Sequence, residues 1–233
     1  MISVIISTYN RNEVLKHNIL ALINQGVEDY EVVVSDDGGD TSTKEMLENL
    51  KTPFKIKYYW HEKLGFRLAK ARNEGVKIAS GDRLIFLDQD VILAPGSLKT
   101  FDSLNIKKCY WVGTKKLVPL SFYEQKINDE TILNDFNVFE SQHHGTLKSN
   151  IGSLGFMSRS DFDNLEGFDE QFVGYGFEDT EFMSRLKDVG ILCFKSQVVG
   201  YHIEHQGQPI NQHNRFLFSQ KYKNKIIGKK VNI

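Results

Sequence analysis

Apolar and polar positions alternate with two different periods along the first ninety residues. Short runs rich in apolar residues cover 2–7, 30–35, 54–60 and 84–87, which is typical of strands. Patterns with a helical period lie between them, at 12–26, 43–50 and 67–79. This order predicts a single α/β domain with a mostly parallel central sheet flanked by helices.

Local signals indicate where these helices begin and end. Asn12 is a good N-cap for the first helix, and Gly26 is expected to end it. The second helix is expected to stop near Pro53 and the third at Gly81, since neither residue favours continued helix.

Beyond residue 90 the pattern is less regular. It predicts a short helix that begins at 95–96, another at 160–165, a longer helix ending near 188, and strands at 110–118, 152–158, 191–195 and 198–201. Glycines in the 152–158 strand indicate close approach to a ligand or another backbone. Residues 121–147 lack a clear period, so we expect an irregular insertion or short helices there.

Composition narrows the class of protein. The chain has 233 residues, 40% of them hydrophobic, which is ample for a core, and its formal net charge of −1 argues against a dedicated nucleic-acid binder. Cys109 and Cys193 are read as reduced, buried thiols. The N-terminus does not have the pattern of a signal peptide, and no apolar run approaches the length that spans a membrane, so we expect a cytoplasmic protein.

The strongest chemical signal is Asp88-Gln89-Asp90, directly after the apolar run 84–87. Strand side chains alternate, so both carboxylates are expected on one side of the strand, about 6–7 Å apart. Buried carboxylates are costly unless a cation shares them, and oxygen ligands suit Mg²⁺ or Mn²⁺ with a substrate diphosphate. The alternative is an ordinary loop that exposes two acidic residues.

Polar residues also follow the first two predicted strands. Ligands of open α/β sheets bind beyond the carboxyl ends of the strands, where Thr8 to Arg11 and the pair Asp36-Asp37 are expected. An aromatic ring and acidic groups there can hold a nucleobase, although Asp and Gly also favour turns. Arg72, on the third helix, can reach phosphate or a strand-end carboxylate, or can lie on a solvated face.

A second cluster lies late in the chain. Tyr175, between two glycines, can form a platform for a sugar ring, and Asp179 can serve as a general base. Capping of the following helix by Glu178 and Asp179 is the alternative. His202 and His205 are candidate metal ligands or structural hydrogen-bonding groups, whereas the adjacent pair at 143–144 favours a surface loop.

The last segment is basic. No acidic residue follows Glu204, while six Lys and Arg residues do, between positions 215 and 230. Such a segment can contact anionic lipid or substrate phosphates, or remain solvated.

Taken together, five motifs occur in the order seen in family-two, GT-A-fold inverting glycosyltransferases, which the chain resembles: Ser7-Thr8-Tyr9-Asn10-Arg11, Asp36-Asp37-Gly38, Ala71-Arg72-Asn73-Glu74-Gly75, Asp88-Gln89-Asp90 and Gly174-Tyr175-Gly176-Phe177-Glu178-Asp179. The later half is most similar to bacterial chondroitin and hyaluronan polymerases and to the β-galactosyltransferase C-terminal region. The resemblance covers nearly the whole chain except roughly residues 119–147 and the residues beyond 209. It implies a GT-A, Rossmann-like fold.

The resemblance also implies roles for single residues. Asp90 would bind Mn²⁺ or Mg²⁺ directly, with His202 as the late metal ligand and His205 as its substitute. Asp179 would remove the acceptor's hydroxyl proton. The other implied contacts are with the donor, from Thr8, Tyr9, Arg11, Asp36 or Asp37, Arg72 and Asp88, and with the acceptor sugar, from Glu178 and Tyr175. Tyr175 and Phe177 stand where the relatives commonly have tryptophan and glycine, which leaves acceptor identity open.

These assignments divide the chain into a nucleotide-sugar-binding half at 1–118, an acceptor and catalytic half at 148–209, and a basic tail at 210–233. The expected reaction moves a hexose or N-acetylhexosamine from a UDP-sugar to a glycan or lipid-linked glycan, in bacterial surface polysaccharide synthesis. No nucleic acid is expected as a partner, and the tail is expected to allow peripheral contact with the inner face of the membrane. A non-catalytic nucleotide-sugar-binding module and a nucleotidyltransferase are the competing interpretations.

Overall fold

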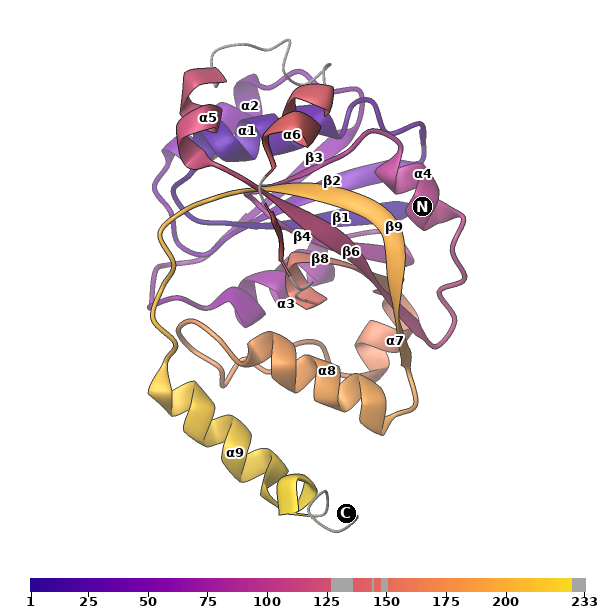
Figure 1. Cartoon of the computed structure of the whole chain (residues 1–233), viewed down its shortest axis with the longest axis vertical. Coiled ribbons are helices and arrows are strands. Elements are labelled where there is room, and N and C mark those ends of the chain that lie inside the picture. Colours follow the sequence, from indigo (N-terminus) through magenta and orange to yellow (C-terminus); the bar gives the residue numbers. More distant parts are fainter. Residues whose placement is uncertain (127–135, 144, 148–150, 228–233) are drawn as a thin grey trace.

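The computed structural model describes residues 1–126, 136–143, 145–147 and 151–227. Within them, one nine-stranded sheet has the order β3-β2-β1-β4-β8-β6-β9-β5, with β7 paired to β6 (Figure 1). Its strands are β1 (Ile2–Thr8), β2 (Tyr30–Asp36), β3 (Lys55–Trp60), β4 (Arg83–Asp88), β5 (Val91–Leu93), β6 (Cys109–Val118), β7 (Gly145–Leu147), β8 (Leu154–Ser158) and β9 (Leu192–Ile203).

Helices cover both faces of this sheet (Figure 1). One face carries α1 (Asn12–Ala21), α2 (Ser42–Asn49), α5 (Leu120–Lys126) and α6 (Phe136–Gln142), and the other carries α3 (Leu68–Ile78), α7 (Arg159–Asn164) and α8 (Glu178–Asp188). The remaining helical segments are α4 (Ser97–Asp102), the 3-10 turn η2 (Ile151–Ser153) and α9 (Gln212–Ile227), which lies beyond α8.

Strand periodicity explains why both faces are apolar. Val4 and Ile6 of β1 pack in one cluster with Leu15 and other residues of α1, α2 and α4. Ile5, between them, belongs to the opposite cluster with residues of α3, α7 and α8. A parallel sheet buried on both faces needs such continuous apolar strands, and this is the pattern that the sequence displays.

The α/β fold predicted from the sequence is confirmed. Strands β1 to β4 pair in parallel, while β8 pairs antiparallel with both β4 and β6, so the complete sheet is mixed. Strands β6 and β9 pair in parallel with each other, and β5, at the end of the strand order, pairs antiparallel with β9.

Several local predictions were wrong. The two strands expected at 191–195 and 198–201 are one strand, β9, whose register with β6 shifts between Val112 and Thr114. Ser196, between the two predicted strands, lies at this irregularity and donates to Val112 O at 3.1 Å, so it belongs to a bulge. The short strand β5 and the helix α9 were not predicted.

The ends of α1 also differ from the prediction. Asn12 is its first residue rather than its cap, because the carboxamide contacts α2 instead: Nδ2 donates to Ser42 Oγ at 2.6 Å, and Oδ1 accepts from Thr43 Oγ1 at 2.9 Å. The helix ends at Ala21, and turns lead on to Gly26, whose φ is +67°.

Short helices α5 and α6 lie in the described parts of the 121–147 segment, as one of the two alternatives for it predicted, and the same segment also contributes strand β7, which was not predicted. His143 lies 3.5 Å from Glu140 Oε1, and His144 lies outside the described residues. Among the helices that the structure describes, none is long enough and apolar enough to cross a bilayer.

Candidate active site

The parallel register aligns the ends of three strands. Thr8 pairs with Asp36 across β1 and β2, and Ser7 pairs with Asp88 across β1 and β4. The carboxyl ends of parallel strands meet at one edge of the sheet, which is where ligands bind in open α/β folds. Thr8, Asp36 and Asp88 therefore begin three neighbouring loops at that edge.

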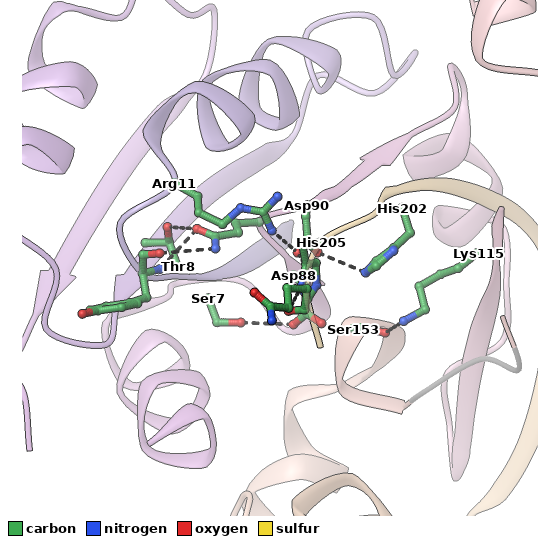
Figure 2. Close-up of polar contacts among 12 residues, drawn as sticks. Ser7, Thr8, Arg11, Asp88, Asp90, Lys115, Ser153, His202 and His205 are labelled. Carbon is green, nitrogen blue, oxygen red and sulfur yellow. Dashed lines mark hydrogen bonds and ion pairs between the residues drawn. The ribbon is translucent and has the colours of Figure 1, made fainter. Parts of the chain in front are cut away.

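The turn after β4 is fixed by residues of the first strand–helix unit (Figure 2). Ser7 Oγ donates to Asp88 Oδ1 at 3.3 Å, and the Thr8 hydroxyl donates to Gln89 Oε1. Asn18 Nδ2 lies within 3.0–3.1 Å of three backbone carbonyl oxygens, those of residues 88, 89 and 91. The backbone path from Asp88 to Asp90 is thereby set by side chains about eighty residues earlier.

Asp90 forms a compact cluster with two histidines that the sequence places more than a hundred residues later. His202 Nε2 lies 3.7 Å from Asp90 Oδ1, and His205 Nε2 lies 3.2 Å from Oδ2. One ligand atom from each of the three residues lies within 4.8 Å of the others. Pairing of Val91 with His202 across β5 and β9 brings the two segments together.

Ionisation in this cluster suits a divalent cation. Burial lowers the pKa of His202 to about 4, which keeps its imidazole neutral. Burial opposes ionisation of Asp90, but a hydrogen bond from His205 and the charges of His205 and Arg11 outweigh it, so the Asp90 pKa lies below its usual value. The Asp90 hydrogen bond raises the pKa of His205. A carboxylate with imidazole nitrogens is a donor set that Mn²⁺ accepts, so the residues present fit such an ion.

Arg72 joins this cluster to the late acidic pair. Its guanidinium side chain is only 1% exposed. Nη2 donates to Asp88 Oδ1 at 3.2 Å, while Nη1 donates to Asp179 Oδ1 at 2.9 Å and lies 3.7 Å from Glu178 Oε1. One buried cation therefore contacts the carboxylates of both halves of the chain.

The acids around Arg72 differ in their protonation. Burial raises the pKa of Glu178 to about 7, helped by the charge of Asp179 and opposed by that of Arg72. Burial likewise raises the pKa of Asp88, against the charge of Arg72. Burial disfavours the charged guanidinium, but Asp179, Asp88 and Glu178 outweigh it and raise the pKa of Arg72.

Gly152 allows these groups to come together. A Cβ on Gly152 would lie 2.3 Å from Arg72 Cζ and 2.4 Å from Asp179 Oδ1, distances that real carbon atoms do not adopt. Gly152 lies in the 3-10 turn η2 rather than in the strand predicted from 152, because β8 begins at Leu154, and the close approach expected of this glycine is to the Arg72–Asp179 pair.

The predicted nucleotide-binding residues lie at the same edge but have partners within the protein. Asp36 accepts from Gly39 N at 2.7 Å and from Tyr58 OH at 3.0 Å. Asp37 accepts from Arg67 N at 2.7 Å and lies 3.3 Å from His61 Nε2.

The other predicted residues point in several directions. Arg11 Nη1 donates to Asp90 Oδ2 at 2.7 Å, so Arg11 lies on the candidate metal ligand (Figure 2). Lys63 Nζ lies 3.8 Å from the centre of the Tyr9 ring. Tyr175 is 42% exposed on the other side of the site, next to the buried Glu178.

Lys115 is a site residue that the sequence did not reveal. Its side chain is buried, and Nζ donates to Ser153 Oγ at 2.6 Å, beside His202 (Figure 2). Its charge opposes protonation of both Asp88 and His202. The adjacent Lys116 pairs with Glu140 toward the surface, and two lysines in a row gave no sign that one of them faces inward. Asn18 did carry a signal, because it is a polar residue on the apolar face of its helix.

Comparisons with known proteins agree with this architecture. Residues 3–101 match the family described as glycosyl transferase family 2, and residues 136–206 match the family described as the N-terminal domain of galactosyltransferase. Validoxylamine A glucosyltransferase of Streptomyces hygroscopicus subsp. jinggangensis is 30% identical over 82% of this chain and 52% of its own length. Chondroitin synthase of Escherichia coli is 28% identical over 89% of this chain and 35% of its own. The chain thus spans about half, or less, of these relatives.

Solved structures show the same fold at lower sequence identity. GalNAc-T7 with UDP, GalNAc and Mn²⁺ has a TM-score of 0.70 and 18% identity, covering 94% of this chain and 47% of that one. S. aureus TarS in complex with UDP-GlcNAc has a TM-score of 0.65 and 19% identity, covering 89% of this chain and 59% of that one.

Proposed function

We propose that this chain, which carries a family 2 glycosyltransferase domain with the GT-A fold, transfers a sugar from a UDP-sugar to a hydroxyl group of a glycan acceptor, with inversion at the anomeric carbon. The observation that carries the proposal is the position of Arg72, buried between Asp88 on the donor side and Asp179 on the acceptor side. A site that only binds a nucleotide has no need for a second carboxylate held opposite the first.

In the proposed reaction Asp179 is the general base. Its Oδ1 accepts a hydrogen bond from Arg72, and its Oδ2 takes the proton of the acceptor hydroxyl. The acceptor's hydroxyl oxygen bonds to the anomeric carbon as it loses this proton. The bond from the anomeric carbon to the diphosphate breaks on the opposite face, in a single displacement. Glu178, with a pKa of about 7, can donate to or accept from a neighbouring acceptor hydroxyl.

The donor side binds and orients the leaving group. Asp90, His202 and His205 would hold a divalent cation, Mn²⁺ or Mg²⁺, which neutralises negative charge on the departing nucleoside diphosphate. Lys115 adds a buried positive charge beside this position. Thr8 and Tyr9, together with Asp36 or Asp37, are proposed to line the uracil pocket. The aspartates now accept hydrogen bonds from the protein itself, so a bound donor would have to replace or share those partners.

Binding of UDP tests the donor half of the proposal. Calorimetric titration of UDP is expected to show tighter binding with Mn²⁺ than without it. Asp90→Ala and the two histidine variants, His202→Ala and His205→Ala, are expected to remove the Mn²⁺-dependent part. Equal UDP affinity in all four proteins with Mn²⁺ would contradict the assignment, and unequal losses in the histidine variants would identify the stronger ligand.

Product analysis separates the proposal from its competitors. A screen of UDP-sugars, with release of UDP followed and glycan products identified by mass spectrometry, is expected to yield transfer. UDP binding without turnover of any donor would favour a non-catalytic binding module. Release of pyrophosphate from a nucleoside triphosphate and a sugar 1-phosphate would indicate a nucleotidyltransferase.

The acceptor is proposed to be a glycan, free or linked to lipid, as in the synthesis of bacterial surface polysaccharide. Peripheral membrane contact stays a prediction, and it is favoured by Arg215, Phe216 and Lys223, which are exposed on α9. Sedimentation with vesicles that contain or lack anionic phospholipid tests it. Equal recovery in the supernatant with both vesicles would contradict membrane contact at the inner face.

A further inference from the structure

The loop that carries Tyr175 has backbone angles that are unfavourable for most residues. Gly174, Gly176 and Phe177 all have positive φ, at +85°, +97° and +74°. For Phe177 this conformation is unfavourable, because its side chain disfavours the left-handed region. Asp179 follows two residues later, in the first turn of α8. Something outside the loop must therefore hold the shape that presents Tyr175 and Asp179.

The beginning of α9 supplies that support. Four consecutive carbonyl oxygens of the loop, at residues 173 to 176, accept hydrogen bonds from two residues, Asn211 and Asn214. Asn211 Nδ2 donates to Val173 O at 2.8 Å, and Asn211 N donates to Tyr175 O at 2.9 Å. Asn214 Nδ2 donates to Gly174 O at 3.3 Å and to Gly176 O at 2.8 Å.

Packing around these bonds excludes water. Asn214 is completely buried. Farther along α9, the Phe218 ring lies 5.5 Å from that of Phe177, and Tyr222 OH donates to Glu181 Oε1 of α8 at 3.3 Å. A buried carboxamide whose hydrogens go to two backbone carbonyls is costly to replace, since those carbonyls would lose their partners.

The same loop also touches the donor side. Gly174 N donates to Phe66 O at 2.7 Å, and the rings of Phe66 and Tyr175 lie 6.5 Å apart. Its carbonyls are thus held by α9 and one of its amides by the loop before α3. Only the carbonyl side depends on Asn211 and Asn214.

We propose that Asn214 and Asn211 are positioning residues, which fix the 173–177 loop so that Tyr175 and Asp179 meet the acceptor sugar. This inference rests on the proposed function, and it assigns the start of α9 to the acceptor site, whereas the sequence suggested a tail that contacts lipid or substrate phosphates or stays solvated. Neither residue itself contacts the donor side, so we expect UDP binding to be unchanged when they are substituted.

Asn211 offers a clean test because its two side-chain atoms have separate partners. Oδ1 accepts from His213 N at 2.8 Å, which caps α9, while Nδ2 donates to Val173 O. Asp is as good a cap as Asn, so Asn211→Asp keeps the cap and removes only the bond to the loop. Asn214→Asp places carboxylate oxygens against two carbonyls with little change in volume. His213→Ala, at an exposed position of the same turn, is the matched control.

The experiment uses the full chain, with the donor and acceptor that the screen identifies. Asn214→Asp is expected to lower kcat/KM for the acceptor by about tenfold or more, and Asn211→Asp by less. In both variants the Kd of UDP with Mn²⁺ is expected to equal the wild-type value. His213→Ala is expected to keep both the wild-type kcat/KM and the wild-type Kd. Faster amide hydrogen exchange confined to 173–177 is expected in both Asp variants.

Wild-type kinetics in the folded Asn211→Asp and Asn214→Asp proteins would overturn the inference. So would parallel losses of acceptor turnover and UDP affinity, because they would indicate general damage rather than positioning. If Asn214→Asp does not fold, Asn211→Asp decides alone. Absence of transfer by the wild-type protein would instead contradict the proposed function, and loop exchange in the variants would still report whether α9 holds the loop.

Discussion

The proposed donor side and the proposed acceptor side of the site are constructed in different ways. On the donor side, Ser7, Thr8 and Asp88 lie at the ends of parallel strands, where sheet register places them next to each other. On the acceptor side, Tyr175 lies on a loop whose carbonyls are bound by α9. Backbone ladders repeat the same hydrogen bonds along whole strands, whereas the loop depends on a few specific side chains. We therefore expect the donor side to tolerate changes elsewhere and the acceptor side to be sensitive to them.

Arg72→Met should produce the largest effect, because Arg72 contacts both sides. Three carboxylates would lose a buried cation, and removal of one partner from a buried ionic group costs about 3–5 kcal/mol. Urea unfolding measures this loss. Lys77→Met is the control, since it removes only an exposed ion pair with Glu74, worth less than about 1 kcal/mol. Equal unfolding midpoints for the two variants would contradict the bridging role.

Asp179→Asn should separate the two sides. Loss of a general base is expected to lower the transfer rate by about 100- to 10,000-fold, while calorimetric UDP binding with Mn²⁺ stays unchanged. Asp163→Asn, an exposed carboxylate on α7, is expected to leave both quantities unchanged. Transfer at the wild-type rate by Asp179→Asn would refute its assignment as the base.

Glu178→Gln should change how stability depends on pH. The pKa of Glu178 in the folded protein is about 7, above the ordinary value of 4.5. A carboxyl group with a raised folded pKa contributes most stability below pH 4.5, and that contribution is lost as pH rises through 7. The wild type should therefore lose about 3 kcal/mol relative to Glu178→Gln between pH 4.5 and pH 8. Unfolding free energies of both proteins at these two pH values measure the difference, and parallel pH profiles would contradict the buried acid.

Two glycine variants give the smallest expected effect and compare strain with contact. Gly174→Ala combines an unfavourable φ of +85° with a Cβ only 2.6 Å from Asn211 Nδ2, whereas Gly176→Ala has a φ of +97° and open space to 3.6 Å. Backbone strain alone costs about 1 kcal/mol, so Gly176→Ala should raise the acceptor KM slightly and Gly174→Ala more. The reverse order would show that α9 does not determine the loop's shape.

Much of the donor half is readable from the sequence. The apolar runs and helical periods up to residue 90 give the strand–helix order, and the parallel register then follows from it. The acidic residues at the ends of β2 and β4 lie at the expected edge of the sheet. Two details were not readable: the partners that Asp36 and Asp37 find within the protein, and the direction of Arg11 toward Asp90.

Less of the later half is readable, for a physical reason. Lys115 and Asn214 have no local pattern that marks them, because each acts on a group far away in the chain: Ser153 and the 173–177 loop. The antiparallel direction of β8 and the bulge in β9 were also not readable, because both depend on how strands distant in sequence pair.

By itself, the sequence determined the residue types, the periods of the elements and the order of the motifs, since these depend on neighbours along the chain. Only tertiary structure decided that Arg72 lies between Asp88 and Asp179, that Asp90 meets two late histidines, and that α9 holds the loop of Tyr175. Contacts between distant segments arise from sheet pairing and side-chain packing, which no local window of residues contains.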